Sequence, residues 1–141
     1  MKKMIYMVIV TVLLTCFAIP LSSCQENEMR QYYAERSNYL TATGTVAYIS
    51  FNEDNNSLYI DFSGLMPVFD DTCFKIVGQN YVLVQQRGIE ELLHVGDQIE
   101  FITAPKYFGD GYVMPIVSVT VDGEIILEFE EGLINFLEWQ N

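Results

Sequence analysis

The chain has 141 residues, of which 50% are hydrophobic and 18% are charged, so an intrinsically disordered protein is excluded and one packed domain is expected. It carries 19 acidic and 7 basic residues, for a net charge of −12. A protein that binds nucleic acid needs a basic surface to neutralise phosphates. The charge balance therefore argues against nucleic acid as a partner.

Residues 1–23 have the pattern of a signal peptide. Lys2 and Lys3 form a short basic region, and residues 4–19 after them carry no charge. This apolar stretch is shorter than the roughly 20 residues that a transmembrane helix needs. We therefore interpret it as the core of a cleaved signal rather than as a retained anchor helix.

The segment Leu21-Ser22-Ser23-Cys24 carries the most specific motif of the chain. It resembles the lipobox of bacterial lipoproteins, in which an aliphatic residue and two small residues precede an invariant cysteine. The resemblance implies that signal peptidase II cuts before Cys24 and that this cysteine carries the lipid. Two or three acyl chains, at about 0.8 kcal/mol per buried CH₂, anchor a protein stably. We expect a protein on the extracytoplasmic side of a bacterial membrane, at the cell surface or in the periplasm.

Cys16 is the weaker alternative as the lipid site, because Leu14-Thr15 precedes it and apolar residues follow it. With Cys24 lipidated, Cys73 has no partner for an intramolecular disulfide, so the fold must depend on its core. Cys73 and the single His94 cannot supply the three or four ligands of a zinc site. We predict no metal and no cofactor.

The acidic balance of the mature chain allows two interpretations. It keeps the domain soluble and away from an anionic bilayer, or it favours cationic partners outside the cell.

After the signal, residues 24–40 are expected to be the lipidated N-terminus and a tether with a short helix over 28–40, and residues 41–141 to be a single β-rich domain. Alternation of polar and apolar residues predicts most of its strands, and Ala47, Ile49 and Phe51 share one face of the first. The expected elements are strands near 46–51, 58–62, 73–77, 81–84, 98–103, 117–121 and 125–128, a short helix over 88–94 and a C-terminal helix from about 130.

Two turns need a choice between alternatives. Residues 52–57 are read as a hairpin tip rather than a calcium loop, because no acidic residue follows at the EF-hand position. In the last hairpin, a two-residue loop Asp122-Gly123 would place valines opposite glutamates. A three-residue loop over 121–123 instead pairs Val119 with Ile125, and we prefer that register.

Six or so short strands with an internal helix resemble a small OB-like barrel. The resemblance is one of fold, mainly β with a short internal and a C-terminal helix. It implies a ligand-binding face, with oligosaccharides favoured over nucleic acid at this charge.

The segment 104–115 stands out because it combines three aromatic residues, two glycines, a lysine and an aspartate between two strands. It is either a cap on the barrel end or a binding loop. We expect Arg87 on the same rim. The candidate ligand-binding residues are Arg87, Lys106, Tyr107, Asp110 and Tyr112.

The chain carries no Gly-x-Ser-x-Gly motif, phosphate-binding loop or dinucleotide-binding motif. We expect a binding or interaction module of the cell envelope, not an enzyme, with glycans or envelope proteins as partners. An envelope structural or assembly factor is the alternative. A small hydrolase of envelope polymers is a further one, and it would need two facing carboxyl groups.

Overall fold

The computed structural model describes residues 20–109 and 111–141. The basic region and core of the expected signal, with Cys16, lie outside the described residues. The chain divides into two compact units, Met1–Ala34 and Glu35–Asn141, which we describe separately. Within the described ranges, no helix is both long enough and apolar enough to cross a membrane.

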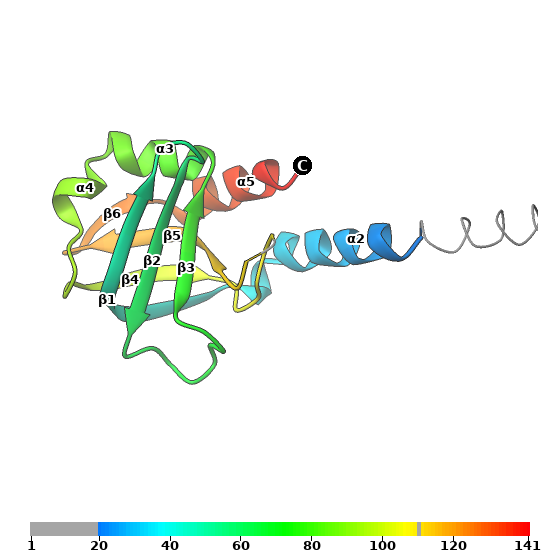
Figure 1. Ribbon diagram of the computed structural model, residues 1–141, viewed down its shortest axis with the longest axis horizontal. Helices are drawn as coiled ribbons and strands as arrows, with labels where there is room; N and C mark the ends of the chain where they lie inside the picture. The colour runs from blue at the N-terminus through cyan, green and yellow to red at the C-terminus, as the bar shows by residue number, and fades with distance from the viewer. Residues whose placement is uncertain (1–19, 110) are drawn as a thin grey trace, which may run out of the picture. The chain divides into compact units, whose positions relative to one another are not determined.

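In the first unit, the described residues form helix α2 (Pro20–Ala34), drawn in blue and cyan in Figure 1. Residues 21–24, which resemble a lipobox, belong to its first turns, and Cys24 is exposed. The expected helix over 28–40 is wrong at its end, because the chain leaves the helix at Glu35. That residue has extended backbone angles, and its carboxylate accepts a hydrogen bond from the Ser37 N–H at the start of the 3₁₀ helix η1 (Arg36–Asn38).

The second unit is a closed barrel of five strands with a sixth strand added (Figure 1). β1 pairs antiparallel with β2 and β4, β3 and β5 follow on either side, and parallel pairing of β3 with β5 closes the ring. This strand order is that of an OB-like barrel, so the predicted fold class is confirmed. The elements are β1 (Leu40–Asn52), β2 (Ser57–Ser63), β3 (Cys73–Val77), α3 (Gln79–Gln86), α4 (Ile89–Leu92), β4 (Gln98–Thr103), β5 (Met114–Val121), β6 (Glu124–Leu127) and α5 (Phe129–Trp139).

Strand β1 reaches both halves of the barrel because a β-bulge interrupts it between Val46 and Tyr48. The bulge shifts the alternation by one residue. Val46 is buried and Ala47 is exposed, whereas Ile49 and Phe51 pack against the core. Ala47 therefore does not share the inward face with Ile49, as simple alternation predicted, and Tyr48 points outward.

Three phenylalanine rings fill the barrel interior. Phe62 and Phe101 stack with centroids 4.5 Å apart, and the ring of Phe74 meets both edge-on at 5.4 and 5.0 Å. All three side chains are buried. The barrel interior is thus filled by side chains, so the groups that can contact a ligand lie on the outer surface.

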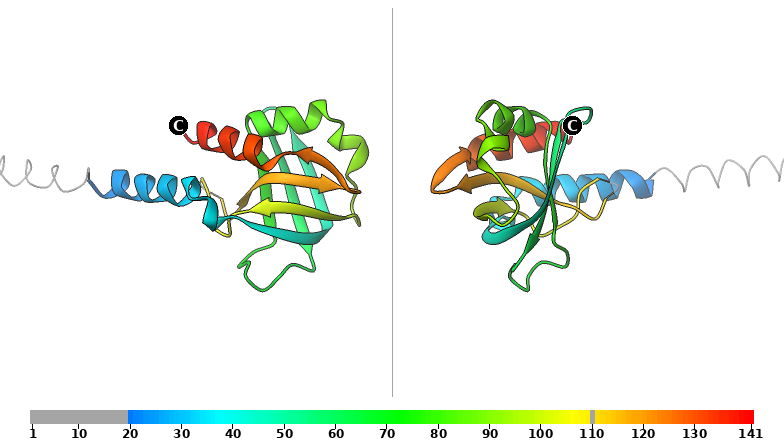
Figure 2. Two further views of the ribbon diagram at one scale, coloured as in Figure 1. Left: turned by 180° about the vertical axis from the view of Figure 1, so that it is seen from behind. Right: turned by 60° about the vertical axis from the view of Figure 1, so that its left-hand side comes forward.

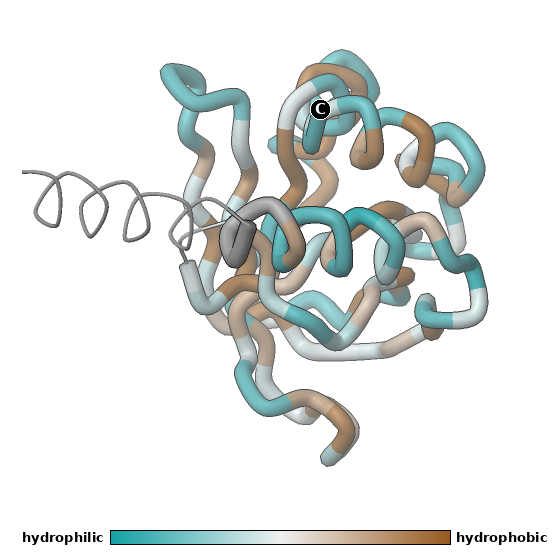
Figure 3. Tube along the Cα trace, turned by 90° about the vertical axis from the view of Figure 1, so that its right-hand side faces the viewer, coloured by the Kyte–Doolittle hydropathy of each residue, from teal (hydrophilic) through white to brown (hydrophobic). Residues whose placement is uncertain are grey.

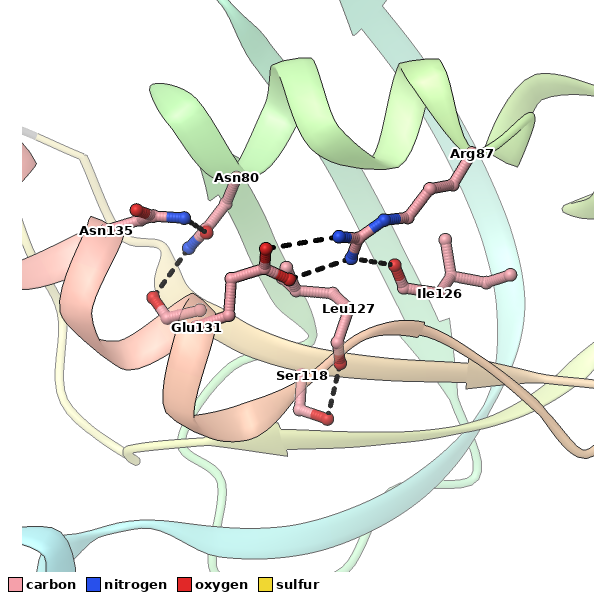
Figure 4. Close-up of polar contacts among 8 residues, drawn as sticks. Asn80, Arg87, Ser118, Ile126, Leu127, Glu131 and Asn135 are labelled. Atoms are coloured by element: carbon pink, nitrogen blue, oxygen red, sulfur yellow. Dashed lines mark hydrogen bonds and ion pairs between the residues drawn. The ribbon is translucent and has the colours of Figure 1, made fainter.

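Residues 81–84, predicted as a strand, belong to helix α3. β3 ends at Val77, and Gly78 turns the chain with a φ of +59°. The buried face of α3 then comprises Asn80, Tyr81 and Val84. The amide of Asn80 donates to the Gly132 carbonyl at 2.7 Å and accepts from Asn135 at 3.0 Å (Figure 4). The four apolar residues 81–84 are too few to distinguish a helix from a strand by their period. The helix expected over 88–94 is confirmed as α4.

The register predicted for the last hairpin is wrong. Val121 pairs with Glu124 across a two-residue loop, and Asp122 and Gly123 both have positive φ, 51° and 80°. Such a turn matches the twist of the flanking strands. The register then shifts, so that Val119 pairs with Leu127 instead of Ile125. Val121 does lie opposite Glu124, but a bulge, which alternation does not reveal, changes the pairing from Val119 onward and removes the rest of the mismatch that had argued against the short loop.

Helix α5 covers the outside of β5 (Figure 2), and its buried residues are Gly132, Leu133 and Phe136. The approach is close at Gly132, where an added Cβ would lie 1.8 Å from the Val117 carbonyl oxygen. β5 is consequently buried on both faces along nearly its whole length. The other side of the barrel, formed by β1, β2 and β3, is not covered by α5.

Candidate functional site

The outward face of β1, β2 and β3 carries two rows of cross-strand neighbours. Tyr48 pairs with Asp61 and Asp61 with Cys73, while Tyr59 of β2 pairs with Lys75 of β3. In Figure 1 no helix among the described residues of Glu35–Asn141 crosses the front of these strands. We call these five residues the strand face. Tyr48 is 54% exposed, and the other four are partly exposed.

The polar groups of the strand face interact with one another. The Sγ of Cys73 lies 3.9 Å from the Asp61 carboxylate. Hydrogen bonding to Cys73, burial, and the nearby charges of Cys73, Asp61 and Asp71 raise the pKa of Tyr59 to about 12. The Tyr59 hydroxyl therefore keeps its proton at any physiological pH and can donate a hydrogen bond.

Two loops meet at one end of this face. β3 and β5 run parallel, with Phe74 opposite Met114, so the segments that precede them, 64–72 and 104–113, reach the same end of the barrel. Burial raises the pKa of Tyr107, and the charges of Asp71 and Asp70 raise it further. The aromatic residues of the second loop and the two carboxylates of the first thus lie at the same end of the barrel. We call these two segments the loop end.

The loop 104–113 is anchored by one aromatic side chain. Phe108 is only 4% exposed, and its ring meets Phe136 edge-on at 5.3 Å and Trp139 at 5.6 Å. Its N–H donates to the Val113 carbonyl at 3.1 Å and closes the loop, while Gly109 turns the chain with a φ of +64°. Phe108 therefore fastens the loop to helix α5.

The tyrosines of the same loop have a different environment. The rings of Tyr107 and Tyr112 meet edge-on with centroids 5.5 Å apart. Tyr107 is partly buried against the core, but Tyr112 is 76% exposed. Lys106 is exposed beside them, and Asp110 lies outside the described residues. The structure thus brings Tyr107 and Tyr112 together at the surface.

Arg87 is not on this rim, contrary to the expectation from sequence. It follows α3, and its guanidinium forms an ion pair with Glu131 at 2.9 Å and donates to the Ile126 carbonyl at 2.9 Å (Figure 4). In Figures 1 and 2 this end of α3 and the loop 104–113 lie on opposite sides of the barrel. Arg87 joins α3 to β6 and α5, because its partners come from those elements.

The sequence reading missed the strand face and the apolar tip of the loop 64–72. Met66 and Val68 at that tip are 44% and 51% exposed. In Figure 3 this loop projects below the barrel and is hydrophobic at its tip. Tyr59 and Asp61 alternate with buried Ile60, so the sequence pattern indicates that they face outward. It does not indicate which residues of β1 and β3 lie beside them.

Among the described residues, no group of three or more histidine, cysteine, aspartate or glutamate side chains is arranged to hold a metal ion. Comparison of the chain with models of protein families, with curated proteins and with solved structures gives no significant match. Within the described residues of Glu35–Asn141, the geometry defines a closed OB-like barrel with one face that no helix of this unit covers and an aromatic loop beside it.

Proposed function

We propose that the protein is a lipid-anchored binding module of the bacterial cell envelope, which takes its ligand on the strand face and the loop end. The observation that carries the proposal is Tyr112, a large aromatic side chain that is 76% exposed on a loop fixed by buried Phe108. A soluble protein seldom displays aromatic and aliphatic side chains together unless they contact a partner. Met66 and Val68 are also exposed, on the other loop of the loop end.

The fold supports this location for the site by analogy. OB barrels commonly bind their ligands on the face of the second and third strands and with the loop between the fourth and fifth. Here those positions are occupied by Tyr59, Asp61, Cys73 and Lys75, and by the loop that carries Tyr107 and Tyr112. Fold analogy alone assigns no ligand, so the proposal depends on the exposed side chains themselves.

The lipobox supports the anchor, with Cys24 as the lipid attachment site and the barrel on the extracytoplasmic side. The test is metabolic labelling with radioactive palmitate, followed by separation of membrane and soluble fractions. We expect label in the wild-type protein and in Cys73→Ser, but none in Cys24→Ser, which leaves the membrane fraction. Label that persists in Cys24→Ser would refute the anchor.

The binding surface is tested in living cells by a photoreactive p-benzoylphenylalanine in place of Tyr112. The matched control places it at Ile125, which is 53% exposed on β6. We expect crosslinks at position 112 and none at position 125. Equal crosslinking at both positions would contradict a defined site. Crosslinks only to a second copy of the chain would instead favour the envelope structural or assembly factor.

A further inference from the structure

The loop end combines exposed apolar side chains with carboxylates. Met66, Val68 and Tyr112 are 44%, 51% and 76% exposed. Asp70, directly after the apolar tip, is exposed, and Asp71 is partly exposed. From these residues, and on the basis of the function proposed above, we infer that the ligand is a protein segment that carries basic side chains among apolar ones.

The apolar part of the surface favours a protein segment over a sugar polymer. Methionine is flexible and polarisable, so Met66 can adapt to side chains of different shape. Tyrosine is enriched at protein interfaces because it offers a large ring and a polar tip. A glycan could stack on Tyr112, but its hydroxyl groups would gain nothing from contact with Met66 and Val68.

The charge of the surface selects basic segments. Among the described residues, the strand face and the loop end carry Asp61, Asp70 and Asp71 against Lys75 and Lys106. The whole chain has 19 acidic and 7 basic residues, so its long-range field also attracts cations. Anionic polymers are repelled by the same field.

The arrangement of Tyr107 and Tyr112 beside Asp70 and Asp71 suits a guanidinium group in particular. The parallel pairing of β3 with β5 brings the loops that carry these residues to the same end of the barrel. The charges of both aspartates also raise the pKa of the Tyr107 hydroxyl. A guanidinium can pair with a carboxylate and also lie against an aromatic face. A segment with arginines next to leucines would use the carboxylates, the rings and the apolar tip together.

The experiment measures binding of synthetic peptides to the full-length protein purified in non-ionic detergent. The probes are a short peptide that alternates arginine with leucine, its counterpart with glutamate in place of arginine, and a neutral oligomer of N-acetylglucosamine. We expect binding of the arginine peptide alone. Tyr112→Ala and Asp70→Asn each weaken it by about tenfold or more, and added salt weakens it further.

Two control variants separate a site from general attraction to an acidic protein. Asp122→Asn removes one negative charge from the β5–β6 turn, as Asp70→Asn does from the loop end, and Ile125→Ala truncates an exposed apolar residue of β6. Neither changes binding if the inference is correct. An Asp122→Asn effect equal to that of Asp70→Asn overturns it, and so does binding of the glutamate peptide.

The same experiment distinguishes the inference from the proposed function. If only the sugar oligomer binds, and Tyr112→Ala abolishes that binding, the basic segment is overturned as the ligand. The proposed binding surface is then still supported. Failure of all three probes, with crosslinks in cells still specific to position 112, also overturns the basic segment alone. Failure of the probes and of the crosslinks overturns both.

Discussion

The ring of Phe108 packs edge-on against the ring of Phe136, with centroids 5.3 Å apart, and so fixes the loop that carries Tyr112 to helix α5. One buried side chain thus links the outer apolar layer of the barrel to its most exposed aromatic residue. The stability of the fold and the shape of the proposed binding surface depend on the same contact.

Replacement of Phe108 by alanine therefore has two effects. It removes a side chain that is 4% exposed, which lowers the free energy of unfolding by about 3–5 kcal/mol in urea titrations. It also abolishes crosslinking through position 112, because the loop loses its anchor. Tyr112→Ala, at an exposed position, changes stability by less than about 0.5 kcal/mol. Equal stability of the two variants would show that Phe108 does not anchor the loop.

Gly132 sets how closely α5 approaches the barrel. An alanine Cβ there would lie 1.8 Å from the Val117 carbonyl oxygen, so the helix must move away from β5. We expect Gly132→Ala to destabilise the protein by about 1–3 kcal/mol, although alanine favours a helix over glycine by about 1 kcal/mol. Ile134→Ala, on the exposed face of α5, is the control in thermal unfolding. A Gly132→Ala protein as stable as wild type would contradict the close contact.

Arg87 is expected to stabilise the fold without contacting ligand. Its ion pair with Glu131 joins side chains that are each 37% exposed, so solvent screens it, and its bond to the Ile126 carbonyl adds a further contribution. Arg87→Gln should cost about 1–2 kcal/mol in urea titrations. In a double-mutant cycle Glu131→Gln adds little to it, because both variants break the same pair. Reduced crosslinking at position 112 in a folded Arg87→Gln protein would show that Arg87 contributes to the binding surface after all.

Most of the barrel strands could be predicted because they alternate between a core and a solvent side. Leu58, Ile60 and Phe62 of β2 are all buried, as alternation requires. Prediction failed where an irregularity or a distant partner decides the structure. The bulges in β1 and in the β5–β6 pair each shift the alternation by one residue. In α3, the buried position of Asn80 depends on partners in α5, more than 50 residues away.

The candidate site was predictable only where a single segment forms it. Glycines and aromatic residues marked the loop of Tyr107 and Tyr112 directly. The strand face depends on the registers that place Tyr48, Asp61 and Cys73 in one row, which no local pattern encodes. Arg87 was misplaced because its partner Glu131 lies 44 positions further along the chain.

The strand face gives a prediction about pH. Hydrogen bonding to Cys73 is the main reason why the pKa of Tyr59 rises from 10.0 to about 12. Between these values the folded protein holds a proton that the unfolded chain has lost, so the free energy of unfolding falls as the pH rises through this range. In NMR titrations of the labelled tyrosine ring, Cys73→Ala should return the Tyr59 pKa most of the way to 10.0 and remove most of this loss of stability. Asp61→Asn, which removes a weaker contribution, should lower that pKa less. A Tyr59 pKa that is unchanged in Cys73→Ala would show that the two side chains do not interact on this face.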